Sequence, residues 1–322
     1  MPSGPTLTVS GGTTMQEVVT GDIILATDFN NPRTNMNTLL NTSADVTLGT
    51  YTESSVFGWG QGGAGVAAAT SGELVLATGA AGAFKDLQDD VQAACLFLGI
   101  TPRTGTGSDV VASDQITAAD WTDLMRDVKD VWDGRFSPAA WTETISSTLA
   151  YTASWTNSIQ CESTFTWGTE AACRAYFNGG GRVGISAALT NGTTTQDTQW
   201  STKLSNMGTA EINYNDLTAG VTVSTWQGFY ELTDTYQTVL QYFGGVSPYT
   251  NDYVQIEARV DSTTNPTIIY MRTTMLDADD GVIDDPVTGD ITVTAHAFTP
   301  AASGSGFSFT APTITAGTLT GS

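Results

Sequence analysis

Apolar residues recur at helical spacing in three segments of the first half of the chain. Residues 29–36, 84–91 and 121–128 each begin with an aromatic residue, followed by an apolar or proline residue three positions on and another apolar residue seven positions on. This spacing places the three side chains on one face of a helix. Residues 20–27 and 71–78, which precede the first two segments, are also nearly alike. The pattern predicts short amphipathic helices built from a repeated unit.

The ends of these helices carry their own signals. Thr117 with Asp120 three positions later is typical of a capped N-terminus, and Gly134 is predicted to be the C-cap. The second helix is expected at about 83–98. In the first helix we expect Pro32 in the opening turn, where its missing N–H does little harm. The residues predicted on the buried faces are Phe84, Leu87, Val91, Ala94 and Cys95, then Trp121, Leu124, Met125, Val128, Val131 and Trp132.

The period changes after about residue 137. Segments rich in Thr, aromatic and β-branched residues, separated by Gly, Asn and Asp, predict an antiparallel β-sandwich. A short helix at 169–177 is expected to interrupt the strands, and the run Asn178-Gly-Gly-Gly181 to turn the chain into a strand near Val183. The predicted strands are residues 141–151, 183–189, 209–214, 221–225, 237–243, 253–260, 267–276 and 291–298.

The predicted fold class is therefore α+β, in four regions. Residues 1–19 are polar and unpatterned, so we expect an N-terminal arm that becomes ordered only against a partner. Residues 20–135 form the helical repeat region, and residues 136–300 the antiparallel β-sandwich domain. Residues 301–322 form a C-terminal tail, which contains Gly306-Phe-Ser-Phe309 and is expected to pair with a neighbouring subunit.

The net charge of the chain limits the classes of partner that it is expected to bind. Only 14% of the residues are charged, against about 25% in an average domain, and 11 basic residues against 33 acidic ones give a net charge of −22. Such a charge opposes binding to nucleic acid and to anionic membranes. The longest apolar run, Ala93–Ile100, is far shorter than the roughly 20 residues of a spanning helix. We therefore expect no nucleic acid partner and no membrane insertion, and the first residues show no secretory signal.

The three cysteines, Cys95, Cys161 and Cys173, do not form a disulfide framework, because their number is odd and the chain is large. We predict three buried thiols that act as small apolar side chains. Pairing of Cys161 with Cys173 stays the alternative. A zinc site is not expected, because the chain has no CxxC motif and no histidine near these residues.

The acidic segment 277–285 is the candidate metal site. Asp277 and Asp279 begin it as in a calcium loop, but Gly281 comes one place early and Thr288 replaces the bidentate Glu. We favour a solvated hairpin loop, with a surface calcium site as the alternative and no other cofactor. The candidate ligands are Asp277, Asp279, Asp284 and Asp285.

Aromatic residues in Ser/Thr/Gly surroundings could instead stack on sugars. The candidates are Trp155, Trp167, Tyr242, Phe243 and Tyr249. Because β-domains place aromatic residues inward and interfaces are rich in them, we favour strand core and subunit interface over glycan binding.

Enzymatic interpretations have little support in the sequence. The one histidine, His296, lies in an alternating strand and is expected to pack on one face of a sheet. Neither Gly-x-Ser-x-Gly nor His-Glu-x-x-His occurs, so the motifs of serine hydrolases and zinc proteases are missing. Paired carboxylates of a glycosidase stay open, because nothing in the sequence selects two of the 33 acids.

Several stretches carry a resemblance to a known group of proteins. The run Ala175-Tyr-Phe-Asn-Gly-Gly-Gly-Arg-Val-Gly-Ile-Ser-Ala187, then Asp197-Thr-Gln-Trp200 and Met207-Gly-Thr209, resembles a module of virion structural proteins of tailed phages, especially those of cyanobacteria. Residues Tyr249–Val260, the acidic loop Asp277–Asp285 and Gly289-Asp-Ile-Thr-Val293 resemble the same module. The units Ile24–Phe29 and Ile116–Trp121 resemble segments upstream of it, and together the likeness covers most of residues 20–300. The resemblance implies a place in the virion, at the tail, baseplate, neck or fibre.

The expected function is therefore a non-enzymatic virion component that assembles with copies of itself, as a homotrimer, and with other virion proteins. Short helices and exposed sheet edges bury little apolar surface alone, so contacts between copies would complete them. Two alternatives stay open: an adhesin that binds host surface glycan, and a glycan-cleaving tail protein.

Overall fold

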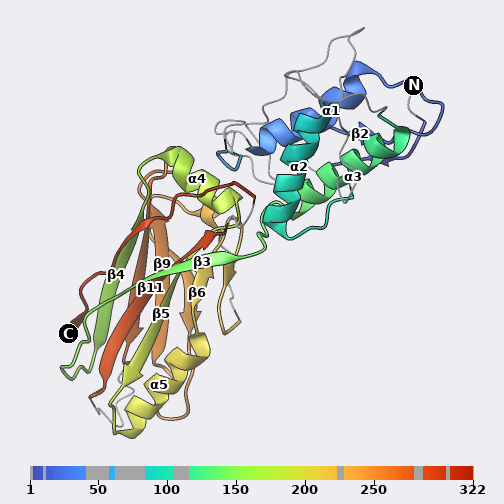
Figure 1. Cartoon of the computed structure of the whole chain (residues 1–322). Coiled ribbons are helices and arrows are strands. Elements are labelled where there is room, and N and C mark those ends of the chain that lie inside the picture. Colours follow the sequence, from blue (N-terminus) through green and yellow to red (C-terminus); the bar gives the residue numbers. More distant parts are fainter. Residues whose placement is uncertain are drawn as a thin grey trace. The chain divides into compact units, whose positions relative to one another are not determined.

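The computed structural model describes residues 3–9, 12–40, 58–61, 84–103, 116–222, 228–278, 286–301 and 305–321. Within them the chain is α+β, with five α-helices and several antiparallel sheets (Figure 1). It divides into two compact units. Unit 1 comprises Met1–Trp141, Arg174–Gly180 and Pro300–Phe309, and unit 2 comprises Thr142–Cys173, Gly181–Thr299 and Thr310–Ser322. None of the described helices is long and apolar enough to cross a membrane.

Three helices form the centre of unit 1: α1 (Ala26–Leu40), α2 (Phe84–Leu98) and α3 (Ala118–Gly134). The faces predicted for the second and third helices are buried, as expected. The indole of Trp121 lies edge-on to two rings, with centroid distances of 5.9 Å to Phe29 and 5.1 Å to Phe84. The first aromatic residue of each sequence repeat therefore contributes to one shared cluster.

The ends of the helices differ in part from the predictions. Thr117 and Asp120 form the predicted capping box of α3. Gly134, however, is the last helical residue, and the C-cap is Arg135 in a right-handed conformation. Its guanidinium donates to the Trp132 carbonyl oxygen, which takes the place of a left-handed glycine cap.

Pro32 was expected in the opening turn of the first helix, but α1 begins six residues earlier, at Ala26. The Asp28 carboxylate accepts a hydrogen bond from the Leu25 N–H at 2.6 Å, which stabilises this earlier start. Phe29 and Met36 are buried on either side of the proline. Their burial offsets the hydrogen bond that proline removes from a helix interior.

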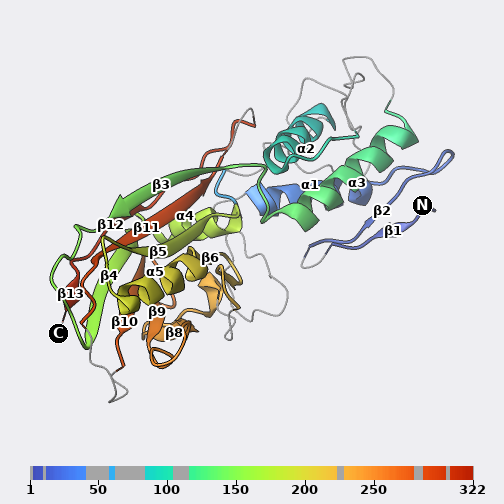
Figure 2. The same cartoon turned by 90° about the horizontal axis from the view of Figure 1, so that it is seen from below.

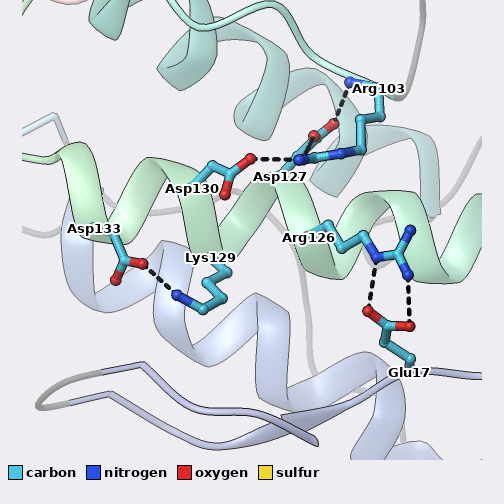
Figure 3. A network of polar contacts seen from close by, with 7 residues as sticks. All are labelled: Glu17, Arg103, Arg126, Asp127, Lys129, Asp130 and Asp133. Carbon is cyan, nitrogen blue, oxygen red and sulfur yellow. Dashed lines mark hydrogen bonds and ion pairs between the residues drawn. The ribbon is translucent and has the colours of Figure 1, made fainter. Parts of the chain in front are cut away.

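The N-terminal segment is part of the fold of unit 1 rather than an arm that waits for a partner. Strands β1 (Thr6–Leu7) and β2 (Met15–Gln16) pair as an antiparallel ribbon, and the side chain of Met15 is 1% exposed. Glu17 accepts two hydrogen bonds from Arg126 of α3 (Figure 3). Buried apolar residues and a charged pair therefore hold this otherwise polar segment against the helices.

Figure 3 shows further ion pairs along α3. Arg103 donates to Asp127 at 2.8 Å and to Asp130 at 2.7 Å, and Lys129 pairs with Asp133 one turn on. The Asp127 side chain is fully buried and also accepts from the Arg103 main-chain N–H at 2.8 Å. In this part of an acidic chain, basic residues are placed where they neutralise clustered carboxylates.

Unit 2 contains two antiparallel sheets (Figure 2). The six-stranded sheet has the order β12-β4-β10-β9-β8, with β13 also on β4, and the five-stranded sheet has the order β3-β11-β5-β6-β7. The strands of the first are β4 (Ser158–Thr166), β8 (Gln237–Tyr242), β9 (Tyr253–Val260), β10 (Ile268–Leu276), β12 (Thr313–Thr315) and β13 (Thr320–Gly321). Those of the second are β3 (Trp141–Ser147), β5 (Arg182–Thr190), β6 (Ala210–Ile212), β7 (Leu217–Thr218) and β11 (Asp290–Pro300).

Alternate residues of the long strands are buried, so each sheet has one apolar face. In β11, Ile291, Val293, Ala295 and Ala297 are all 0% exposed, while the residues between them are partly exposed. Strands β9 and β10 show the same alternation. Many of the residues that point away from these apolar faces are polar, and some form cross-strand contacts, such as Arg272 of β10 with Glu257 of β9.

The other helical elements are α4 (Glu170–Asn178), α5 (Thr195–Met207) and the 3-10 turn η1 (Phe229–Glu231). Gly180 follows α4 with φ +87°, and a Cβ there would lie 2.3 Å from the Phe136 carbonyl oxygen. The glycine run therefore makes the predicted turn into β5, and glycine is required at this position.

Several of the described elements were not expected: β1 and β2 in the N-terminal segment, β4, α5, β7, η1, and strands β12 and β13 in the C-terminal tail. The tail was predicted to pair with a neighbouring subunit, but both of its strands pair with β4 of the same chain. Most of the predicted strand at 221–225 lies outside the described residues. The other predicted strands agree with observed ones, apart from shifted ends.

Candidate functional site

Strand β3 lies at the edge of the five-stranded sheet, and its only neighbour in the described part of that sheet is β11. The strand and the segment after it expose large apolar side chains: Ile145 is 59% exposed and Leu149 is 92% exposed. An edge strand offers main-chain N–H and C=O groups to another strand, and charged residues usually guard against that. Here Glu143 is the one charged residue between positions 141 and 151.

The edge is held firmly on its inner side. Thr148 donates its N–H to the Val293 carbonyl oxygen at 2.9 Å, and its hydroxyl accepts from the Val293 N–H at 3.0 Å. Tyr151 pairs with Ile291 through two main-chain hydrogen bonds of 2.9 and 3.0 Å. The exposed apolar groups are therefore presented on an ordered edge rather than on a loose loop.

A groove of about 520 Å³ runs beside this edge. Residues 146–151 line one side, and residues 314–319 of the C-terminal tail line the other. Every lining residue is apolar, glycine, or a hydroxyl-bearing Ser, Thr or Tyr. In a chain of net charge −22, an uncharged groove is a surface that a second acidic molecule can approach without direct repulsion.

Beside the edge, three side chains from adjacent strands form a continuous polar contact. Glu143 of β3 lies 2.6 Å from His296 Nδ1, and Ser186 Oγ of β5 lies 2.8 Å from His296 Nε2. His296 belongs to β11, which separates the other two strands. Its imidazole stacks on Phe298 at 6.0 Å with an interplanar angle of 3°. The imidazole therefore lies between the hydroxyl and the carboxylate and is fixed by a hydrogen bond to each.

The sheet register brings the imidazole and the hydroxyl together. His296 stands directly opposite Gly184 of β5, and Ser186 is the next residue of β5 on the same face. A Cβ at Gly184 would lie 2.8 Å from the Ala210 carbonyl oxygen, so glycine lets β6 approach β5 closely here. On the same face Arg182 pairs with Glu211 at 2.6 Å. Burial raises the pKa of Glu211, and the nearby Arg182 and His296 oppose this rise without cancelling it.

A second polar cluster lies around α5. The Asp197 carboxylate accepts from the N–H groups of Thr193, Thr194, Thr288 and Gly289, and from the Thr288 hydroxyl, at 2.7 to 3.2 Å. Burial by itself raises the pKa of Asp197, but the hydrogen bonds from Thr194 and Thr288 outweigh it and leave the pKa far below its usual value. This carboxylate caps α5 and joins it to the segment before β11.

Farther along α5, Lys203 is 1% exposed. Its Nζ donates to the Asp252 carbonyl oxygen at 2.7 Å and lies 4.2 Å from the centroid of the Trp200 ring. Burial lowers the pKa of Lys203 to about 8, although Asp252 and Asp277 oppose the change. The cluster fixes the ends of β9 and β10 against the helix.

The predicted calcium ligands are only partly described. Asp277 is buried and accepts from Gln196 Nε2 at 2.6 Å, whereas Asp279, Asp284 and Asp285 lie outside the described residues. Among the residues that are described, no group of three or more His, Cys, Asp or Glu side chains is arranged to hold a metal ion.

The aromatic candidates for glycan binding are mostly internal. Trp155 and Trp167 are each 2% exposed and Tyr249 is 8% exposed, while Tyr242 is half-buried and Phe243 is exposed. A buried ring cannot stack on a sugar, so the core interpretation fits Trp155, Trp167 and Tyr249.

The three cysteines are buried, and Cys161 and Cys173 do not form a disulfide. Burial raises the pKa of Cys95 and of Cys161 to about 12, so these thiols stay protonated. They fit the predicted role of small apolar side chains.

The contact of Glu143, His296 and Ser186 was not predicted. In sequence, Glu143 lies 153 positions from His296 and Ser186 lies 110 positions from it, and no short motif joins the three residues. The available signal was the alternation of residues 291–298, which places His296 on the polar face of its strand.

Comparison with protein-family models, with curated proteins and with solved structures found no match to the chain.

Proposed function

We propose that this protein is a structural subunit of a tailed-phage virion that assembles with copies of itself through the β3 edge. The observation that carries the proposal is the ordered, exposed and nearly uncharged edge formed by β3 and residues 148–151. Ordered edges with exposed Ile and Leu side chains are avoided in proteins that stay single, because they promote pairing. A virion as the destination rests on the sequence resemblance, and a trimer stays the predicted stoichiometry.

The proposal includes the finer architecture. We infer that the two sheets of unit 2 pack as a sandwich, since each long strand buries alternate residues. We also infer that the helices of unit 1 derive from one repeated unit. Their equivalent positions support this, because Phe29, Phe84 and Trp121 share a cluster and the residues seven positions on, Met36, Val91 and Val128, are all buried.

Unit 1 offers a second surface for assembly. Three consecutive apolar residues precede α1, and they are 69%, 36% and 41% exposed at Ile23, Ile24 and Leu25. Contiguous exposed apolar residues of this kind mark contact surfaces. The segment belongs to unit 1, whereas the β3 edge after Trp141 belongs to unit 2. We therefore assign Ile23–Leu25 to contacts with other virion proteins.

Light scattering during size-exclusion chromatography tests the proposal. The wild-type chain should elute as an oligomer, and Leu149→Asp should shift it to the monomer mass. Val246→Asp is the matched control, because Val246 is also exposed, at 60%, and lies outside the β3 edge. A wild-type monomer at high concentration, or equal effects of both variants, would count against assembly through β3.

Placement in the virion needs a separate test. An antibody against the purified chain should bind phage particles at one defined place in electron micrographs. Absence of the chain from purified particles would reject the virion assignment and leave the assembly proposal standing.

A further inference from the structure

The outer face of the five-stranded sheet carries the three groups that nucleophilic catalysis by serine requires. Ser186 supplies a hydroxyl, His296 a base within 2.8 Å of it, and Glu143 a carboxylate within 2.6 Å of the other ring nitrogen. A nucleophile bonded to a base, with the base oriented by a third group, is recognised by geometry rather than by sequence position. The three residues come from three adjacent strands, β5, β11 and β3.

We propose that Ser186 is a nucleophile that His296 activates and Glu143 positions, and that it reacts with short acyl esters of exposed alcohols. The proposal does not depend on self-assembly, because all three residues belong to one chain. A strand face suits small, exposed esters, because a substrate there is reached from solvent.

The reaction follows from the hydrogen bonds. With its proton on Nδ1, the imidazole donates to Glu143 Oε1 and leaves Nε2 to accept from Ser186. Ser186 Oγ bonds to the ester carbonyl carbon as its proton passes to Nε2. The ester C–O bond then breaks, and the alcohol leaves with that proton. Water, deprotonated by the same Nε2, releases the acyl group as a carboxylic acid and restores the serine.

The surroundings of His296 favour a role as a base over a purely structural role. The His296 side chain is 13% exposed and that of Glu143 is 47% exposed, so solvent reaches the site and a small ester can approach. The imidazole is held between two strands by both nitrogens, and it stacks on Phe298. A base that is already oriented loses little entropy when the reaction begins.

The rate should be modest. Strands β5 and β11 stay paired in register from Arg182 to Thr190, so the N–H groups with which each strand faces the other serve the sheet rather than a reacting carbonyl oxygen. Donors at that oxygen are worth roughly 10²- to 10³-fold in rate. We therefore expect a measurable acylation step followed by slow release of the acyl group.

The test is acetylation of the full chain by p-nitrophenyl acetate. The expected result is a burst of about one p-nitrophenolate per chain, together with an acetyl group on the peptide that contains Ser186, seen by mass spectrometry. Ser186→Ala and His296→Gln should each lower the burst rate roughly tenfold or more. Ser147→Ala is the matched control, because Ser147 bears a hydroxyl on the neighbouring strand that contacts Thr294 instead of a histidine.

Glu143 needs a readout that a structural role would not move. Glu143→Gln keeps a hydrogen-bond acceptor but removes the charge that stabilises the protonated imidazole, so the acylation rate should fall and its pH dependence should shift. Thermal unfolding of each variant shows whether it is folded. Acetylation confined to lysines, or an unchanged acylation rate at Ser186 in a folded His296→Gln variant, would overturn the proposal.

Discussion

Arg126 and Glu17 form a two-point ion pair: Nε donates to one carboxylate oxygen at 2.7 Å and a terminal nitrogen to the other at 2.8 Å. The pair joins α3 to the end of β2 across 109 positions of sequence. The Glu17 side chain is 7% exposed and that of Arg126 is 45% exposed. Paired geometry of this kind gives more stability than a single surface contact. It places the N-terminal segment in the folded unit.

Replacing Glu17 by Gln should lower the free energy of unfolding by about 1–2 kcal/mol, because Arg126 loses its carboxylate while solvent still reaches the guanidinium. Asp89→Asn is the matched control. It breaks the exposed pair of Lys85 with Asp89, which should cost about 0.5 kcal/mol or less. Chemical denaturation measures both. Equal losses in the two variants would mean that residues 1–19 are not docked on α3.

Asp197→Asn should destabilise the protein by roughly 2–4 kcal/mol at neutral pH. The variant weakens a helix cap and several charge-assisted hydrogen bonds at once. Asp234→Asn, which removes an exposed carboxylate, serves as control. Because the folded pKa of Asp197 lies below the unfolded value, its stabilisation is present at neutral pH and is lost as the pH falls through the acid range. The difference in stability between wild type and Asp197→Asn should therefore shrink in acid; a constant difference would contradict the hydrogen-bond account.

Lys203 should make stability depend on pH in the alkaline range, with the same sign as Asp197. Its folded pKa, about 8, lies below that of an unfolded lysine, so the unfolded chain binds more protons between about pH 8 and 10.4. Stability should rise with pH in that window. Lys203→Met lacks this titration, so the stability of wild type relative to the variant should increase by roughly 2–3 kcal/mol across it. Lys85→Met is the control at a partly exposed lysine. A flat difference would show that Lys203 titrates normally.

Local signals in the sequence predicted local structure. Thr117 and Asp120 marked the start of α3, and Gly180 marked the turn into β5, because capping and left-handed turns depend on neighbouring residues. The start of α5 carries the same signal, in Thr194 and Asp197. Its few apolar residues hid the helix, since a capping pattern without an apolar stripe does not by itself indicate one.

Long-range structure was harder to predict. Strand β4 reads Ser-Ile-Gln-Cys-Glu-Ser-Thr-Phe-Thr, and its alternate buried residues include polar Ser163. The contact of Ser186 with His296 depends on β11 pairing with β5 in one register. A shift of one residue would move His296 to the other face. No local pattern fixes that register, so the candidate site could not be predicted from the sequence alone.

Hydrogen–deuterium exchange of residues 141–151 tests assembly through β3 most directly. We expect the amide groups of this edge to exchange more slowly in the concentrated wild-type protein than in Leu149→Asp, because a neighbouring copy would pair with or cover them. Exchange in β9, an interior strand, should be the same in both. Rapid exchange of residues 141–151 in a wild-type oligomer, with slowed exchange elsewhere, would contradict the account and place the contact on another surface.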